Sequence, residues 1–449
     1  MPERTRSGRR ASRLETAAGR LTAAERSSLD AIFERLLQSA LDDLGTGPSP
    51  LEVELWASQL WSIWQRGYLV DNDPVAVLAG GLIGYASEHP GHAAVMVLEA
   101  LAAVAPEPYR DQAAEAARAL SSSGAAQPAW AGQVGKSEPT EAWLISDPID
   151  DDGVSVVVGF DGHAGADTVA IYVDHNLGGM AQDAFVIPVS VGKFMDRLRA
   201  RGERRAHRPL DLAEAAARWR AALEVTDLTV GPLVDDELHV LRALLLSRLA
   251  KMPTRGKVPT PPKVDDQARA ALVRSFLSSD DASQLAGSHP QGQETVEHIA
   301  WQLARFSLDY VVGTPLRFSP DMVQRFCLDW APRKLALRDE AFSLVSEVLS
   351  SWIRFVGRRR GIPPSAMQEA VQAVPQFTPE MIRLSRDPGT WGPAKTIALA
   401  LQDRGIDLTN AATVEELVDQ AKPGLDLSAT APDGTSGRRH GRAYLRQIV

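Results

Sequence analysis

Residues 141–189, EAWLISDPIDDDGVSVVVGFDGHAGADTVAIYVDHNLGGMAQDAFVIPV, decide the fold class of this chain. β-Branched residues dominate the segments 154–160 and 168–174, and the glycine-containing turn DGHAGAD separates them. This pattern predicts two antiparallel strands joined as a hairpin. Further strands are expected at 141–146 and 184–189. The whole block is therefore predicted to form one small antiparallel sheet.

Alanine- and leucine-rich segments with helical periodicity lie on both sides of this block. The predicted fold class is α+β and predominantly α-helical, with helical bundle or HEAT-like units and one small inserted antiparallel sheet. The expected parts, in chain order, are a basic disordered tail (1–20), an N-terminal helical repeat-like domain (21–123), a linker (124–140), the β-sheet segment (141–192), a helical segment (193–252), a proline-rich linker (253–264), a C-terminal helical domain (265–422) and a flexible basic tail (423–449).

The N-terminal domain carries clear helix signals. Thr22 and Glu25 have capping-box spacing, and Gly45 is expected to end the helix that they begin. The next segment, PLEVELWASQLWSIWQRG at 50–67, has apolar residues around almost its whole circumference, so its three tryptophans and Ile63 are expected to be buried. Alanine-rich helices are expected to follow near 74–87, 91–104 and 108–122.

Helix signals also mark the C-terminal domain. Three N-caps are predicted: Ser319 before Pro320, Thr378 before Pro379, and Thr413 with Glu416 in capping-box spacing. A buried helical stripe is predicted at Phe342, Val345, Leu349, Trp352 and Val356. The single cysteine, Cys327, lies beside apolar residues in a helical pattern and is expected in the core.

Histidine and carboxylate residues gather at two places in the β-rich block. Asp161 and His163 lie in the first turn, whereas Asp174 and His175 follow the next strand. About six extended residues at roughly 3.3 Å each separate the two groups by about 20 Å, so one site cannot use both. The local group is Asp174, His175 and Asn176, with Asp183 further on. Its candidates for catalysis are Asp174, His175 and Asp183, as metal ligands or as a histidine base oriented by a carboxylate. The alternative is a structural turn completed by the glycines that follow.

The segment VDHNLGGMAQDAF at 173–185 resembles a segment found in an uncharacterised group of high-GC, actinobacterial-type proteins. In that group a helical repeat-like region precedes the β segment and a helical domain follows it. The resemblance extends loosely to DWAPRK at 329–334 and GRRRG at 357–361. It implies an architecture but no known activity.

Two arginine-rich segments are candidate binding sites for anionic partners. They comprise Arg197, Arg199, Arg201, Arg204, Arg205 and Arg208 in one segment, and Arg358, Arg359 and Arg360 in the other. Arginine side chains at these places would suit nucleic-acid phosphates or another anion. Alternatively, the first set neutralises acidic groups of the same chain, and the second complements the negative end of a helix dipole.

The charge of −9 is unevenly distributed along the 449 residues. Residues 1–20 and 434–449 each carry a net +4, which leaves −17 for the rest. Such basic ends are typical of mobile tails that bind nucleic acid or acidic partners, although an acidic body opposes attraction of phosphates. The first twenty residues lack the apolar core of a signal peptide, and no apolar run is long enough for a membrane span. A cytoplasmic location is therefore expected.

Standard catalytic motifs are missing from the sequence: it has no G-x-S-x-G, no Walker loop, no HExxH, and no GxGxxG between a strand and a helix. One cysteine excludes a disulfide framework and a cysteine zinc site. The leading hypothesis is a non-enzymatic interaction or regulatory protein that binds a macromolecular partner, most simply a protein, without a cofactor. Two alternatives are a hydrolytic enzyme at the VDHNLGG loop, with or without a metal ion, and nucleic-acid binding through the arginine-rich segments or tails.

Overall fold

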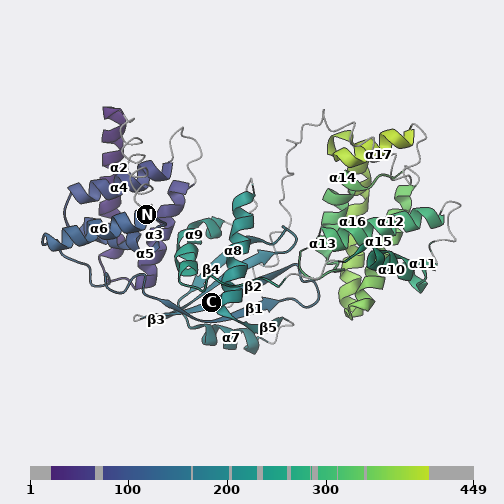
Figure 1. The fold of residues 1–449 in the computed structure, drawn as a ribbon, viewed down its shortest axis with the longest axis horizontal. Coiled ribbons are helices and arrows are strands. Elements are labelled where there is room, and N and C mark those ends of the chain that lie inside the picture. The colour runs from purple at the N-terminus through teal and green to yellow at the C-terminus, as the bar shows by residue number, and fades with distance from the viewer. Residues whose placement is uncertain are drawn as a thin grey trace, which may run out of the picture.

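A computed structural model gives the fold of the chain (Figure 1). It describes residues 22–65, 74–162, 165–201, 205–229, 236–259, 264–283, 285, 292–310, 312–337 and 341–403. The predicted tails at 1–20 and 423–449 and the predicted capping box at Thr413 and Glu416 lie outside these residues. Within them, the architecture is α+β and predominantly helical, as predicted, with a single antiparallel sheet between two groups of helices.

The N-terminal helices begin and end close to the predicted positions. They are α2 (Ala23–Leu44), α3 (Pro50–Gln65), α4 (Pro74–Glu88), α5 (His92–Val104) and α6 (Tyr109–Ser122). The Thr22–Glu25 capping box is present, and Gly45 follows the last residue of α2. Trp61 and Trp64 are buried as expected, whereas Trp56 is only partly buried. The prediction for Ile63 is wrong: its side chain is 61% exposed, because only part of the circumference of α3 faces the described neighbours.

The sheet contains the four predicted strands and a fifth. Its strands are β1 (Glu138–Ser146), β2 (Gly153–Gly162), β3 (Gly165–Asp174), β4 (Met180–Ile187) and β5 (Ala206–Leu210), in the spatial order β4-β3-β2-β1-β5. All neighbouring strands are antiparallel. The sequence AHRPL of β5 lacks strand signals, yet it pairs with β1 at the edge of the sheet, where Pro209 is tolerated because outer N–H groups need no partner.

Helices cover both faces of the sheet (Figure 1). On one face lie α8 (Leu212–Leu228) and α9 (Asp236–Ala250), and Trp219 of α8 donates its indole N–H to the carbonyl of Val156. On the other face lies α7 (Val191–Ala200), whose Phe194 and Leu198 pack against buried residues such as Val157. Successive side chains of a strand point to opposite faces of the sheet, so they contribute to two separate apolar clusters.

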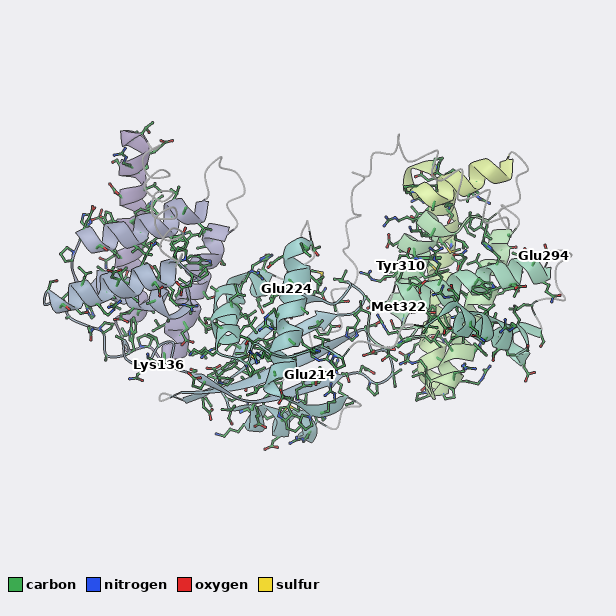
Figure 2. All side chains as sticks on the ribbon, in the orientation of Figure 1. Lys136, Glu214, Glu224, Glu294, Tyr310 and Met322 are labelled. Carbon is green, nitrogen blue, oxygen red and sulfur yellow. The ribbon has the colours of Figure 1, made fainter. Side chains whose placement is uncertain are left out.

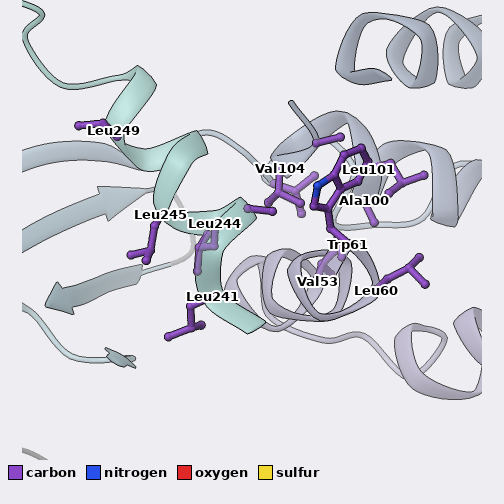
Figure 3. Close-up of a cluster of buried hydrophobic side chains, with 14 of the residues drawn as sticks. Val53, Leu60, Trp61, Ala100, Leu101, Val104, Leu241, Leu244, Leu245 and Leu249 are labelled. Atoms are coloured by element: carbon purple, nitrogen blue, oxygen red, sulfur yellow. The ribbon is translucent and has the colours of Figure 1, made fainter. Parts of the chain in front are cut away.

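One continuous core joins the N-terminal helices to the sheet. Apolar side chains of α3, α5 and α9 belong to one cluster that includes Trp61 (Figure 3), and the same cluster continues to the α8 and α9 face of the sheet. A buried ion-pair network crosses this core. The guanidinium of Arg248 in α9 lies 2.7 Å from Glu54 of α3 and 2.9 Å from Asp167 of β3, and all three side chains are almost fully buried.

The C-terminal helices enclose a separate apolar cluster. They are α10 (Asp266–Leu277), α11 (Asp280–Ser283), α12 (Gly292–Asp309), α13 (Pro320–Arg325), the π-helical turn η2 (Phe326–Trp330), α14 (Ala331–Lys334), α15 (Phe342–Arg359), α16 (Pro364–Arg386), the 3₁₀ turn η4 (Pro388–Thr390) and α17 (Pro393–Asp403). The predicted stripe of α15 is buried. Cys327 is also buried, and burial raises the pKa of its thiol to about 12. Figure 2 shows Tyr310 and Met322 on the side of this domain that faces the sheet.

Of the two predicted N-caps that the structure describes, one is confirmed and one is wrong. The hydroxyl of Ser319 accepts the N–H of Met322 and caps α13. Thr378 and Pro379 instead lie inside α16, which also contains Pro375. The hydroxyl of Thr378 donates to the carbonyl of Val374, and burial of the apolar face of α16 outweighs the hydrogen bonds that the two prolines remove.

Replacement of Arg248 by Met should leave Glu54 and Asp167 buried without their cation. We expect a loss of about 3–5 kcal/mol in the free energy of unfolding, the range found when one partner of a buried ion pair is removed. Urea denaturation measures this loss. Arg242→Met on the same helix is the control, because Arg242 pairs with the half-exposed Asp227 and should contribute at most about 1 kcal/mol. Equal losses in both variants would contradict a special role for the buried network.

Candidate functional site

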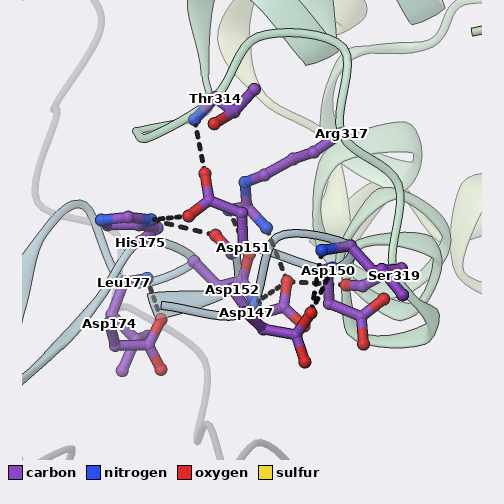
Figure 4. Close-up of polar contacts among 12 residues, drawn as sticks. Asp147, Asp150, Asp151, Asp152, Asp174, His175, Leu177, Thr314, Arg317 and Ser319 are labelled. Atoms are coloured by element: carbon purple, nitrogen blue, oxygen red, sulfur yellow. Dashed lines mark hydrogen bonds and ion pairs between the residues drawn. The ribbon is translucent and has the colours of Figure 1, made fainter. Parts of the chain in front are cut away.

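Three loops meet where the sheet contacts the C-terminal domain (Figure 4). They are the β1–β2 loop at 147–152, the β3–β4 loop at 175–179, and the segment 312–319 that leads into α13. The first two loops lie at the same end of the sheet because Gly153 pairs with Asp174. The VDHNLGG sequence therefore lies at a junction between two domains.

The centre of the junction is Arg317, whose side chain is 0% exposed. Its guanidinium donates to Oδ1 of Asp152 at 2.5 Å and to Oδ1 of Asn176 at 2.6 Å. Oδ1 of Asp152 also accepts the hydroxyl of Ser319 at 2.6 Å and the amide of Asn176 at 3.0 Å. We call Asp152, Asn176, Arg317 and Ser319 the clasp. Its charge pair and hydrogen bonds offset the cost of burying a guanidinium. The bonds of Arg317 and Ser319 join the C-terminal domain to the sheet, and the bond between Asn176 and Asp152 joins two loops of the sheet.

His175 packs beside the clasp and is 9% exposed. Its Nδ1 lies 2.9 Å from the carbonyl oxygen of Asp151, and because a carbonyl only accepts, Nδ1 carries the proton and donates. Burial lowers the pKa of the imidazole. A Cβ at position 313 would lie 2.4 Å from Nδ1, and the φ of Gly313 is +90°, so both space and conformation require glycine there. The carboxylate of Asp151 accepts the N–H of Thr314 at 2.8 Å.

Asp174 organises the turn that follows β3. Its Oδ1 accepts the N–H of Leu177 at 2.9 Å, and its carbonyl accepts the N–H of Gly179. Gly178 and Gly179 have φ values of +74° and +83°. This is the geometry expected of the structural-turn alternative. The side chain is 6% exposed, and burial raises the pKa of the carboxyl to about 6, against the opposing effect of Arg325.

Asp183 lies in β4, opposite Tyr172 of β3. Because alternate residues of a strand share a face, Asp183 is on the same face of the sheet as Tyr172 and Asp174. Its Oδ1 accepts the N–H of Ala184, whereas the imidazole of His175 is directed to Asp151. Within the described ranges, no group of three or more His, Cys, Asp or Glu side chains is arranged to hold a metal ion. As expected, Asp161 lies at the opposite end of the β2–β3 hairpin; His163 is outside the described residues.

The first arginine-rich segment begins in α7 and ends in β5. Arg199 pairs with Asp196 at 3.1 Å and lies over the ring of Trp143, and Arg208 pairs with Glu214 at 2.9 Å. These contacts favour neutralisation within the chain for two of the six candidates. Arg204 lies outside the described residues, and Arg197 is exposed at the end of α7.

The second arginine-rich segment ends α15, and its three side chains have different neighbours. Arg358 pairs with Asp281, and Arg359 donates to Ser275 at 3.4 Å. Arg360 donates to the carbonyl of Ile149 at 3.4 Å, in the β1–β2 loop, and burial lowers the pKa of its guanidinium. Arg360 therefore adds a further contact across the domain junction.

Sequence reasoning missed most of the junction. Asp152, Arg317 and Thr314 lie in segments without a recognisable motif, and Ser319 was predicted only as a helix cap. The run of acidic residues at 150–152 before a strand and the glycine at 313 were the available signals. Neither signal indicates which distant residues make contact, because the partners are more than 130 positions apart in the chain.

Comparison of the chain with protein-family models, with curated proteins and with solved structures found no match. The resemblance at VDHNLGG therefore stays a prediction. Among the helices that the structure describes, none combines the length and apolarity needed to cross a bilayer.

Replacement of His175 by Ala should destabilise the junction. The variant loses the hydrogen bond to the Asp151 carbonyl and leaves a void beside Gly313, so we expect a loss of about 1–3 kcal/mol in stability. Differential scanning calorimetry measures the effect, with His298→Ala on the exposed face of α12 as the control. A purely catalytic role for His175 predicts the opposite result, which is unchanged thermal stability.

Replacement of Asp174 by Asn should change how stability depends on pH. The folded pKa of about 6 exceeds the unfolded value of roughly 3.9, so the wild-type protein loses stability as the pH rises through this window. Asn keeps the acceptor for the Leu177 N–H but does not ionise. The stability of the variant relative to wild type should therefore increase between about pH 4 and pH 7, by on the order of 3 kcal/mol. Urea denaturation at several pH values tests this, and a difference that does not vary with pH would contradict it.

Proposed function

We propose that this protein is a non-enzymatic interaction protein, located in the cytoplasm, that binds a macromolecular partner. The partner is most simply another protein, which binds to the helical surfaces on the two sides of the sheet. The N-terminal helices, in which α5 packs against α2, α3 and α6, would act as a short HEAT-like unit. The proposal requires no cofactor.

The clasp is the observation that carries this proposal. His175 and the nearby carboxylates of Asp151 and Asp152 resemble a catalytic set, but each has a partner within the chain. Nδ1 of His175 donates to the carbonyl of Asp151, and the carboxylate of Asp151 accepts the N–H of Thr314. The carboxylate of Asp152 accepts hydrogen bonds from Arg317 and Ser319. A general base must reach the proton of a substrate, whereas the imidazole of His175 is largely buried, with 9% of the residue exposed. These contacts support a role in holding two binding surfaces in one relative orientation.

Fixed orientation would matter to a partner that contacts both helical groups. When a partner has bound one of two surfaces on a rigid body, the second surface is held close to it at a high effective concentration. This effective concentration falls when the linkage between the two surfaces loosens. The clasp supplies the linkage on the C-terminal side, and the continuous core supplies it on the N-terminal side. Binding by such a partner should therefore depend on the clasp even though the clasp is buried.

The proposal predicts that Asp152→Ala weakens binding of the partner by about tenfold or more, because the variant separates the two surfaces. Crosslinking and mass spectrometry on the full chain would identify the partner, and biolayer interferometry with the purified partner would measure affinity. Asp161→Ala, near the far end of β2, the strand that follows Asp152, is the matched control and should bind as wild type does.

Other results would favour the alternatives. Equal affinity of Asp152→Ala and wild type would contradict the proposal. Hydrolysis of a substrate that is abolished in a folded His175→Ala variant would instead support the enzyme hypothesis. Binding of DNA or RNA that falls steeply with salt, and that depends on Arg197, would support the nucleic-acid hypothesis.

A further inference from the structure

The C-terminal domain contains a cavity of about 810 Å³ away from the junction. It lies between α15 and the turn that connects α10 to α11, which are neighbours in Figure 1. The cavity is open to solvent and is lined mainly by polar and charged side chains. The lining combines three arginines, Arg354, Arg358 and Arg359, with Phe355, which is 7% exposed.

Two of these arginines share one face of α15. Arg354 and Arg358 are four residues apart, so their positions are separated by one turn, or about 6 Å along the helix. In the part of the chain that the structure describes, Arg354 makes no ion pair or side-chain hydrogen bond, although it is exposed to the cavity. A free guanidinium beside a second one is suited to bidentate binding of a phosphoryl group.

Arg358 already has an anionic partner within the chain, which a ligand must displace. Arg358 pairs with Asp281, and Asp280 also lines the cavity. A phosphate monoester carries close to two negative charges at neutral pH, whereas a carboxylate carries one, so such a ligand can displace Asp281 from Arg358. The same two aspartates would repel an extended polyanion, which must place further phosphates near them.

Phe355 is the apolar residue of the cavity lining. The residue is 7% exposed and its ring lies under the guanidinium of Arg359, 5.6 Å from the ring centre, so it adds a small apolar part to the cavity wall beside the arginines. The cavity is several times larger than a phosphate ion, so a ligand can place a phosphoryl group at the arginines and an organic group against this wall.

From this geometry we propose that the cavity is a binding site for a small phosphate monoester. Arg354 and Arg358 hold the phosphoryl group, and Arg359 and Phe355 contact the remainder of the molecule. The site is independent of the clasp and of the macromolecular partner, so it would give the protein a small-molecule ligand in addition to that partner.

Isothermal titration calorimetry on the full chain tests the site with three probes: inorganic phosphate, adenosine 5′-monophosphate and adenosine. We expect saturable binding of the monophosphate, weaker binding of phosphate and none of adenosine. Arg354→Gln should weaken binding of the monophosphate about tenfold, the effect expected for loss of one charged hydrogen-bond donor. Arg305→Gln, an exposed arginine on α12 outside the cavity, is the matched control and should bind as wild type does.

A second variant tests the competition. Asp281→Asn removes the charge that competes for Arg358 and should strengthen binding of the monophosphate several-fold. The proposal is overturned if the monophosphate does not bind, if adenosine binds equally well, or if Arg354→Gln and Arg305→Gln have the same affinity. Unchanged or weaker binding by a folded Asp281→Asn variant would also contradict it.

Discussion

The buried guanidinium of Arg317 determines how the C-terminal domain docks on the sheet. A fully buried cation is unstable unless charged and polar acceptors surround it, and here these acceptors come from two loops of the sheet while the arginine comes from the segment before α13. The charge can therefore be satisfied only when the C-terminal domain is docked on that end of the sheet. Gly313 allows the same segment to approach His175 closely, which makes the docking specific in shape as well as in charge.

A second buried arginine plays the corresponding part at the other end of β3. Arg248 joins Glu54 of the N-terminal helices to Asp167, whereas the clasp lies near Asp174 at the opposite end of the strand. The sheet is thus a connector between two helical groups, with one buried cation for each. The two contacts differ in their surroundings, since Arg248 lies in a continuous apolar core and Arg317 lies among polar loops.

This arrangement explains why residues with catalytic character need not be catalytic. Burial raises the pKa of Asp174 and lowers that of His175, and such shifts are typical of active sites but also of structural networks. At this junction the shifted groups have partners in the loops that they hold in place. The arginine-lined cavity differs, because Arg354 faces open space without a partner among the described residues, and that contrast makes the cavity the better candidate for a ligand.

Local patterns in the sequence were sufficient for the fold class, for four of the strands, for the N-terminal helices and for the turn at VDHNLGG. Each of these depends on residues close together in the chain, such as the alternation in β2 and β3 or the capping box at Thr22 and Glu25. The strand AHRPL, the helical environment of Thr378 and Pro379, and the clasp were decided by tertiary structure. In those places the stabilising partner is distant in sequence, and burial against it outweighs the local preference of the residues.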